Sequence, residues 1–180
     1  MSIGQVIVRV ESKKLVPENL RSLLNIDECG SVVSFVGLTR GTDDGVSVKR
    51  LEFDAWEEKL SDVLREISEL SIEKFKIHSV VIAHRVGIVH PSEPIVCIHV
   101  GSKHRGAGFE ACSWLITELK SQAPLWKKEV RIDGEIWISV NLMAPAVGFD
   151  CLYSTVTSTI NGEEGSTSVS YTHLTLPTTP

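Results

Sequence analysis

Alternating apolar and polar residues mark several stretches of this chain as β-strands. Side chains of a strand point to opposite faces in turn, so this alternation describes a strand with one buried face. In VSVKRLEFDAW, for example, Leu51 and Phe53 fall on one face, and Glu52 and Asp54 fall on the other. The expected strands are Val6–Val10, Ser31–Arg40, Val46–Trp56, Lys76–His90 and Ile95–Val100.

Apolar residues spaced three or four positions apart predict helices in other stretches. A short helix starts at Pro17, a residue that suits the first helical turn, and runs to Asn25. A long helix covers Glu57–Phe75. The inward faces are expected to hold Leu20, Leu23 and Leu24 in the short helix, and Leu60, Val63, Leu64, Ile67 and Leu70 in the long one.

A third helix begins at Arg105 or Gly106 and stops before Pro124. It stops there because the residue before a proline is pushed out of helical geometry. The same three-to-four spacing places its apolar face at Phe109, Cys112, Ile116 and Leu119.

The chain after Pro124 is expected to return to extended structure. LWKKEV is a predicted strand, and RIDGEIWISV is a predicted hairpin. In that hairpin the Asp133-Gly134 pair supplies the positive φ angles of a type I′ turn. Strands and helices are mixed without strict βαβ alternation. The predicted class is therefore α+β, a single domain with mixed, mainly antiparallel strands and two main helices.

Composition and charge favour one soluble globular domain. Of the 180 residues 42% are hydrophobic and 23% are charged, which is enough to build a core. The net charge of −5 argues against a general nucleic-acid binder, because no excess of basic charge covers the surface. No signal-peptide pattern and no apolar run of ~20 residues is found. We therefore expect a cytosolic protein that binds neither nucleic acid nor membrane.

The cysteines and histidines do not have the spacing of reactive or metal-binding sites. The four cysteines contain no C-x-x-C pair, and the six histidines contain no H-x-x-x-H pair. We expect no catalytic cysteine, no metal and no cofactor. His84 and Arg85, at the end of an expected strand, are better explained by bonds to backbone or a carboxylate than by catalysis.

Cationic residues gather in the stretch Gly101–Val130. His104 and Arg105 precede the third helix, Lys120 lies near its end on the margin of the apolar face, and Lys127 follows the proline. Taken alone, Lys120 is explained by an ammonium that favours a helix C-terminus. If all four cations face one cleft, their repulsion is tolerable only where an anion binds or solvent screens them. Both interpretations stay open at this point.

Four motifs of the chain resemble the large, catalytic subunit of molybdopterin synthase: SVVSFVGLTR, AHRVG, GSKHRGAGFEA and LKSQAPLWKKE. The similarity extends over Val6–Trp137. Its most specific part is the segment S-x-H-R-x-x-x-F-E followed by L-K-x-x-A-P-x-W-K, in which two lysines lie seven residues apart around Ala-Pro. Gly108 stands where the family usually has alanine, a difference that costs up to ~1 kcal/mol of helix stability. Beyond Trp137 the sequence no longer resembles the family.

This resemblance implies an α/β-hammerhead-like fold and one reaction. Sulfur would pass from the C-terminal thiocarboxylate of a small ubiquitin-like carrier to cyclic pyranopterin monophosphate, which gives the molybdopterin dithiolene of the molybdenum cofactor. Matched to the family's motifs, Lys120 and Lys127 are expected to be catalytic. Arg40, His104 and Arg105 are expected to bind the anionic substrate, as charge-assisted hydrogen bonds would allow. The resemblance further implies a homodimer core that binds two carriers, a heterotetramer.

An alternative from another class is a non-catalytic module that binds a ubiquitin-like tail or an RNA loop through the same cations. Aromatic residues that stack on bases would support the RNA case. Trp126 and Trp114 are the candidates, and both are better explained by a core or an interface.

The stretch 141–180 differs in character from the rest of the chain. It is rich in Ser, Thr and Pro and contains no Lys or Arg. Because it lacks an amphipathic period, it is predicted to be a disordered tail that follows a catalytic domain over residues 1–140.

Overall fold

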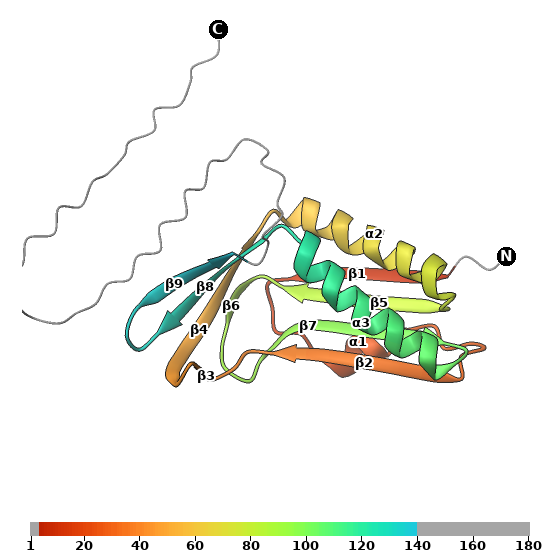
Figure 1. The fold of residues 1–180 in the computed structure, drawn as a ribbon, viewed down its shortest axis with the longest axis horizontal. Helices are drawn as coiled ribbons and strands as arrows, with labels where there is room; N and C mark the ends of the chain where they lie inside the picture. Colours follow the sequence, from red (N-terminus) through yellow and green to blue (C-terminus); the bar gives the residue numbers. More distant parts are fainter. Residues whose placement is uncertain (1–3, 140–180) are drawn as a thin grey trace, which may run out of the picture. The chain divides into compact units, whose positions relative to one another are not determined.

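The computed structural model describes residues 4–139, which form two β-sheets and three helices (Figure 1). The predicted tail over 141–180 lies outside the described residues. In chain order the elements are β1 (Gln5–Glu11), α1 (Pro17–Arg21), β2 (Ser31–Leu38), β3 (Thr42–Asp43), β4 (Val46–Ala55), α2 (Glu57–Phe75), β5 (Ser79–Arg85), β6 (Gly87–Val89), β7 (Pro94–Ser102), α3 (Arg105–Gln122), β8 (Leu125–Arg131) and β9 (Glu135–Ser139).

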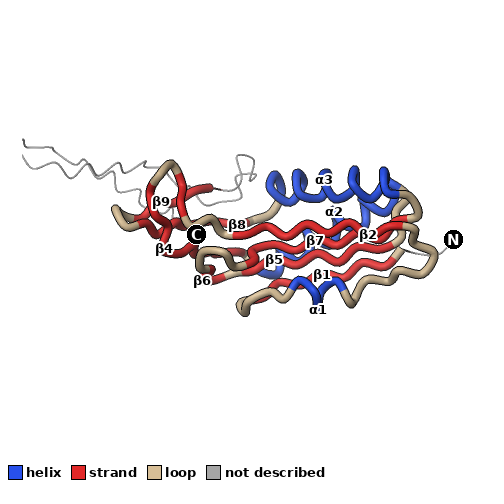
Figure 2. The backbone as a smooth tube through the Cα atoms, turned by 90° about the horizontal axis from the view of Figure 1, so that it is seen from below, coloured by secondary structure: helices blue, strands red, loops and turns tan. Residues whose placement is uncertain are grey.

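The first sheet has the strand order β1-β5-β7-β2. Strands β1 and β5 run parallel, and the β5–β7 and β7–β2 pairs are antiparallel. Helices α2 and α3 cover one face of this sheet, and α1 lies against the other face (Figure 2). The predicted α+β class with mainly antiparallel strands and two main helices is confirmed.

The second sheet has the order β3-β4-β8-β9, with β6 also paired to β4. Every pairing that the structure describes in it is antiparallel. The chain passes between the two sheets several times, since β2 leads into β3, β5 into β6, and α3 into β8. These crossings bring the ends of distant elements together at the junction of the sheets.

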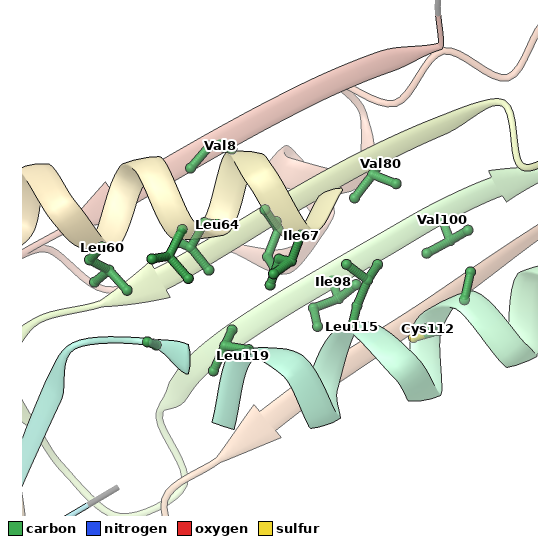
Figure 3. Close-up of a cluster of buried hydrophobic side chains, with 14 of the residues drawn as sticks. Val8, Leu60, Leu64, Ile67, Val80, Ile98, Val100, Cys112, Leu115 and Leu119 are labelled. Atoms are coloured by element: carbon green, nitrogen blue, oxygen red, sulfur yellow. The ribbon is translucent and has the colours of Figure 1, made fainter. Parts of the chain in front are cut away.

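The main core lies between the first sheet and the two long helices (Figure 3). Leu60, Leu64 and Ile67 of α2 and Leu115 of α3 have no exposed surface. Burial of side chains of this size is worth roughly 1.5–3 kcal/mol each, so this layer holds the helices on the sheet. None of the helices that the structure describes is long and apolar enough to cross a membrane.

Four details of the helical predictions are wrong. Helix α1 ends at Arg21 instead of Asn25, and Leu23 is exposed. In α2, Leu70 is exposed and Ser71 is buried, and the Ser71 hydroxyl is satisfied because it donates to the Ser68 carbonyl at 2.7 Å. In α3, Phe109 is 63% exposed.

The inward face of α3 is rotated by about one residue from the prediction. Small buried residues in the first half of the helix allow it to approach the sheet closely. The larger buried residues, Leu115 and Leu119, lie on the same face further along the helix. The buried positions are Gly108, Ala111, Cys112, Leu115 and Leu119.

The predicted single strand over Lys76–His90 is two strands in different sheets. Strand β5 belongs to the first sheet, and β6 pairs with β4 of the second. Val86 lies between the two strands, and Gly87 begins β6 with a φ of +77°, a backbone conformation that glycine adopts without strain. The apolar pattern continues through the break because β5 is buried along its whole length and β6 contributes the exposed Ile88 and the buried Val89, so hydrophobicity alone did not mark it.

The predicted hairpin after Val130 is confirmed, but its type I′ turn is wrong. Strands β8 and β9 pair, with the Arg131 N–H bonded to the Gly134 carbonyl, yet Asp133 does not have a positive φ. The I′ geometry occurs instead between β3 and β4, where Asp44 and Gly45 have φ of 48° and 81°. An Asp-Gly pair therefore predicted the right turn type at the wrong one of two sites.

Candidate active site

A cavity of about 560 Å³ opens where the two sheets and the C-terminal end of α3 meet. We call it the junction cavity. Three of its lining residues can carry a proton at nitrogen: His84, Lys120 and Lys127. The rest of the wall is apolar apart from backbone and comprises Phe35, Val36, Gly37, Leu38, Phe53, Ile95, Val96, Ile98, Ile116, Leu119 and Leu125.

Lys120 and Lys127 reach the junction cavity from consecutive elements. Lys120 lies in the last turn of α3, and Lys127 lies in β8 with 22% of its side chain exposed. Between them Ala123 has extended backbone angles, as expected before Pro124, so the helix stops and the chain turns directly into β8. The sequence spacing of seven residues thus becomes a pair of ammonium groups at one apolar cavity.

A smaller pocket of about 120 Å³ adjoins the junction cavity. Lys127 lines both spaces, and Arg40 lines the smaller one together with Asp43 and Glu129. Arg40 lies two residues after the end of β2, and its Nη2 donates to Asp43 Oδ1 at 2.7 Å. We call this second space the arginine pocket.

His104 and Arg105 are not part of either space within one chain. They lie at the N-terminal end of α3, whereas Lys120 lies in its last turn. The helix has 18 residues, so its two ends are about 27 Å apart at 1.5 Å per residue. A single cleft that holds all of these cations in one chain, which the sequence left open, is therefore wrong.

His84 is a buried, neutral member of the junction cavity. Its Nδ1 lies 2.8 Å from the Arg85 carbonyl oxygen, and because a carbonyl only accepts, Nδ1 carries the hydrogen. Burial lowers the pKa of His84 to about 4. The ring also meets the Phe53 ring edge-on, with centroids 5.5 Å apart. His84 therefore adds no positive charge near the lysines at neutral pH.

Arg85 is held by the contacts that the sequence favoured. Its Nη1 donates to Glu93 Oε2 at 2.8 Å, and its Nη2 donates to the Ile88 carbonyl at 2.7 Å. The structural interpretation of the His84–Arg85 pair, with bonds to backbone and a carboxylate, is confirmed.

The described thiols are poorly suited to act as nucleophiles. Burial raises the pKa of Cys97 to about 11 and that of Cys112 to about 11, and burial also raises the pKa of Cys29. A thiol with a raised pKa holds its proton at neutral pH. Among the described residues, the ionisable groups that line the junction cavity are nitrogen bases and include no thiol.

Three charged residues beside the cavity were missed by the sequence analysis: Asp43, Glu129 and Arg131. Glu129 and Arg131 alternate with Lys127 along β8, so all three lie on one face of the strand. That alternation was readable in the sequence. The contact between Arg131 and Asp43, which lie 88 positions apart, was not readable, because it depends on the pairing of β8 and β3 with β4.

Known proteins with similar sequence and structure share one description. The sequence model of the family described as MoaE protein matches residues 10–122. A molybdopterin synthase catalytic subunit from Pyrococcus abyssi is 32% identical over 128 residues, which cover 71% of this chain and 86% of that protein.

Solved structures give the same result. The molybdopterin synthase structure from Staphylococcus aureus matches with a TM-score of 0.67 and 29% identity, over 77% of this chain and 98% of that one. A complex of subunits 1 and 2 of a molybdopterin-converting factor from Helicobacter pylori matches with a TM-score of 0.59 over 72% of this chain and 88% of that one. At 20% identity, the Helicobacter match shows the fold alone.

Proposed function

Because this chain belongs to the MoaE protein family, we propose that its junction cavity is the sulfur-transfer site of a molybdopterin synthase. The chain is the catalytic subunit of that enzyme and serves molybdenum cofactor biosynthesis. The observation that carries the assignment of the site is the pair Lys120 and Lys127, which line one apolar cavity.

In the proposed reaction, sulfur passes from a carrier's C-terminal thiocarboxylate to cyclic pyranopterin monophosphate, which yields the dithiolene. An extended carrier tail would enter the apolar cavity, where the two ammonium groups orient the anionic thiocarboxylate. Apolar walls exclude water, which strengthens each charge contact inside the cavity. A lysine so placed can also donate or accept a proton during the transfer.

Arg40 is proposed to bind the substrate anion in the arginine pocket. One of its N–H groups is used by Asp43, and 78% of its side chain is exposed, so other donors remain open to a phosphate. Since Lys127 lines both spaces, an anion at Arg40 would lie beside the reacting end of the carrier tail.

His104 and Arg105 are proposed to act at the site of a second copy of this chain. They belong to the substrate-binding set that the family motif implies, yet they lie at the far end of α3 from Lys120. A homodimer can bring the start of one α3 to the cavity of the other copy. The separation of His104 and Arg105 from Lys120 within one chain is thus the observation in favour of the proposed homodimer core.

A small ubiquitin-like subunit is the proposed second partner. The matched Helicobacter structure is a complex of two subunits, which supports a partner of this kind. Two carriers on the homodimer would give a heterotetramer. A cytosolic location is part of the proposal, and the free thiols of Cys29, Cys97 and Cys112 suit a reducing compartment. The domain over 1–140 is proposed to carry the activity without residues 141–180.

The deciding experiment is turnover of the cyclic precursor by Lys120→Ala and Lys127→Ala, each measured beside carrier affinity. General acid–base assistance typically contributes ~10²–10⁴-fold in rate, so each variant should lose turnover on that scale and keep carrier binding. Arginine at either position should restore little, since its group stays charged and cannot share a proton. If both alanine variants keep near-full turnover, the cations only dock a tail or an RNA loop, as in the non-catalytic alternative.

A further inference from the structure

A chain of ion pairs connects Arg40 of the arginine pocket to Lys127 of the junction cavity. Arg40 Nη2 lies 2.7 Å from Asp43 Oδ1, and Asp43 Oδ2 lies 2.7 Å from Arg131 Nη2. Arg131 Nε lies 2.6 Å from Glu129 Oε1, and Glu129 Oε2 lies 3.7 Å from Lys127 Nζ. Each carboxylate therefore gives one oxygen to Arg131 and the other to a cation of the proposed site.

This series of ion pairs is mostly shielded from solvent, and only its Arg40 end is open. The side chains of Glu129 and Arg131 are 5% and 11% exposed, and that of Asp43 is 21% exposed. Arg40, at the end, is 78% exposed. Water screens buried charges weakly, so the contacts of Arg131 are stronger than those of a surface pair.

Arg131 has a different effect on each of its two carboxylates: it holds Asp43 beside Arg40, and it keeps Glu129 from a close contact with Lys127. Glu129 is 3.7 Å from Lys127, a loose contact, because its other oxygen is engaged by Arg131 at 2.6 Å. Without Arg131, the buried Glu129 would have Lys127 as its cation, and a close ion pair between them would hold the ammonium away from the cavity. Asp43 would likewise lose the contact that fixes its position under Arg40.

A second ion-pair network on the same sheet provides the comparison. Arg50 Nε lies 2.7 Å from Glu52 Oε1, and Lys128 Nζ lies 2.7 Å from Glu52 Oε2. By strand alternation these residues lie on the opposite face from Lys127 and Glu129. This network fastens β4 to β8 and lines neither pocket that the structure describes. A purely structural role predicts that breaking either network lowers activity only by lowering the amount of folded protein.

We propose that Arg131 and Asp43 are positioning residues of the sulfur-transfer site, which couple the substrate-anion ligand Arg40 to the catalytic Lys127. This inference rests on the proposed function. In this role Arg131 does not contact the substrate or the carrier tail. It acts on Arg40 through Asp43 and on Lys127 through Glu129. Two directional donors, Nε and Nη2, are needed at once, which an arginine supplies and a lysine does not.

The test compares Arg131→Gln with Arg50→Gln in the assembled enzyme with thiocarboxylated carrier. We expect Arg131→Gln to lower kcat/KM for the precursor 10- to 100-fold, with a fall in kcat and a rise in KM, and Arg50→Gln to stay within about twofold of wild type. Asp43→Asn should mainly raise KM, because it disturbs only the Arg40 side. Arg131→Lys, which keeps the positive charge, should retain less than half of the wild-type kcat.

The double variant Arg131→Gln/Glu129→Gln separates this mechanism from simple loss of structure. If Glu129 captures Lys127 when Arg131 is absent, neutralising Glu129 should return kcat several-fold toward wild type. If kcat of the double variant is no higher than that of Arg131→Gln, the positioning role is overturned. Equal losses of kcat/KM in Arg131→Gln and Arg50→Gln overturn it as well. Wild-type enzyme that fails to convert the precursor overturns the proposed function itself, whereas full activity of Arg131→Gln beside active wild type overturns this inference alone.

Discussion

Arg40, the proposed ligand of the substrate anion, makes few contacts with the rest of the chain. It follows the end of β2, and the loop to β3 leaves 78% of its side chain in solvent, with one ion pair to Asp43 as its described anchor. An exposed ion pair of this kind contributes little to stability, with a median near 0–1 kcal/mol. The position is therefore better suited to binding than to holding the fold.

Arg40→Ala should weaken binding of the pterin precursor much more than binding of the carrier. A hydrogen bond to a charged group is worth ~1.5–3 kcal/mol, which corresponds to roughly a 10- to 150-fold loss of affinity. Titration calorimetry with each ligand measures both quantities. Arg65→Ala, which removes an exposed arginine from α2, is the matched control and should change neither affinity. Equal weakening of precursor and carrier by Arg40→Ala would contradict the assignment.

At the scale of elements, α3 depends on a close approach at Gly108. A Cβ added there would lie 2.7 Å from Ser102 Oγ and 3.0 Å from Val33 Cγ2. Ser102 cannot easily move, because its hydroxyl contacts Ser31 Oγ at 2.8 Å and donates to the His104 carbonyl at 3.0 Å. The expected effect of this glycine was only a loss of helix propensity, and the structure adds a packing reason for it.

Gly108→Ala should therefore lower the free energy of unfolding, even though alanine is the better helix former. Overpacking typically costs 1–3 kcal/mol, and the gain in propensity returns up to ~1 kcal/mol, so a net loss of about 1 kcal/mol is expected. Denaturant unfolding gives the value. Gly106→Ala in the same helix is the control, since an added Cβ there meets nothing within 4 Å, and it should be neutral or stabilising. A more stable Gly108→Ala variant would show that the strand side yields easily.

At the scale of the whole molecule, the proposed site combines cations from opposite ends of α3, and this proposal needs a second copy of the chain. A mixed dimer tests this directly. A chain with Lys127→Ala and a chain with His104→Ala should each be inactive as a homodimer. Mixed, they should recover up to half of the wild-type activity, because one of the two composite sites keeps both intact residues. No recovery in verified mixed dimers would show that each chain builds its site alone.

The pH dependence of folding should carry the signature of the buried histidines. Burial lowers the pKa of His84 to about 4 and also lowers the pKa of His99. Between about pH 6.5 and 4 the unfolded chain therefore binds protons that the folded chain refuses, so stability falls as the pH falls. For His84 the loss is on the order of 3 kcal/mol and is complete below pH 4.

Urea unfolding of His84→Asn over this pH range measures that share. Asparagine keeps an N–H donor near the position of Nδ1 but does not titrate, so the variant should show a flatter fall in stability between pH 6.5 and 4. His90→Asn removes an exposed imidazole and serves as the control. The same steep fall in His84→Asn and wild type would contradict a titrating His84 as the cause.

The sequence by itself determined much of this protein. Alternation and 3.6-residue periodicity located nearly every strand and helix, because each element has one buried face that its own residues specify. The Ala-Pro stop placed Lys120 and Lys127 on either side of one turn, so their convergence on a cavity followed from local geometry. The motifs around them were specific enough to indicate the family.

Only the tertiary structure decided the remainder. The break at Gly87, the outward position of Phe109 and the close approach at Gly108 depend on which sheet each segment packs against, and local patterns do not contain that information. The pairing of β3, β4 and β8 brought Asp43 to Arg131 and so connected Arg40 with Lys127. The length of α3 separated His104 and Arg105 from that site, because a rigid helix turns a distance in sequence into a distance in space.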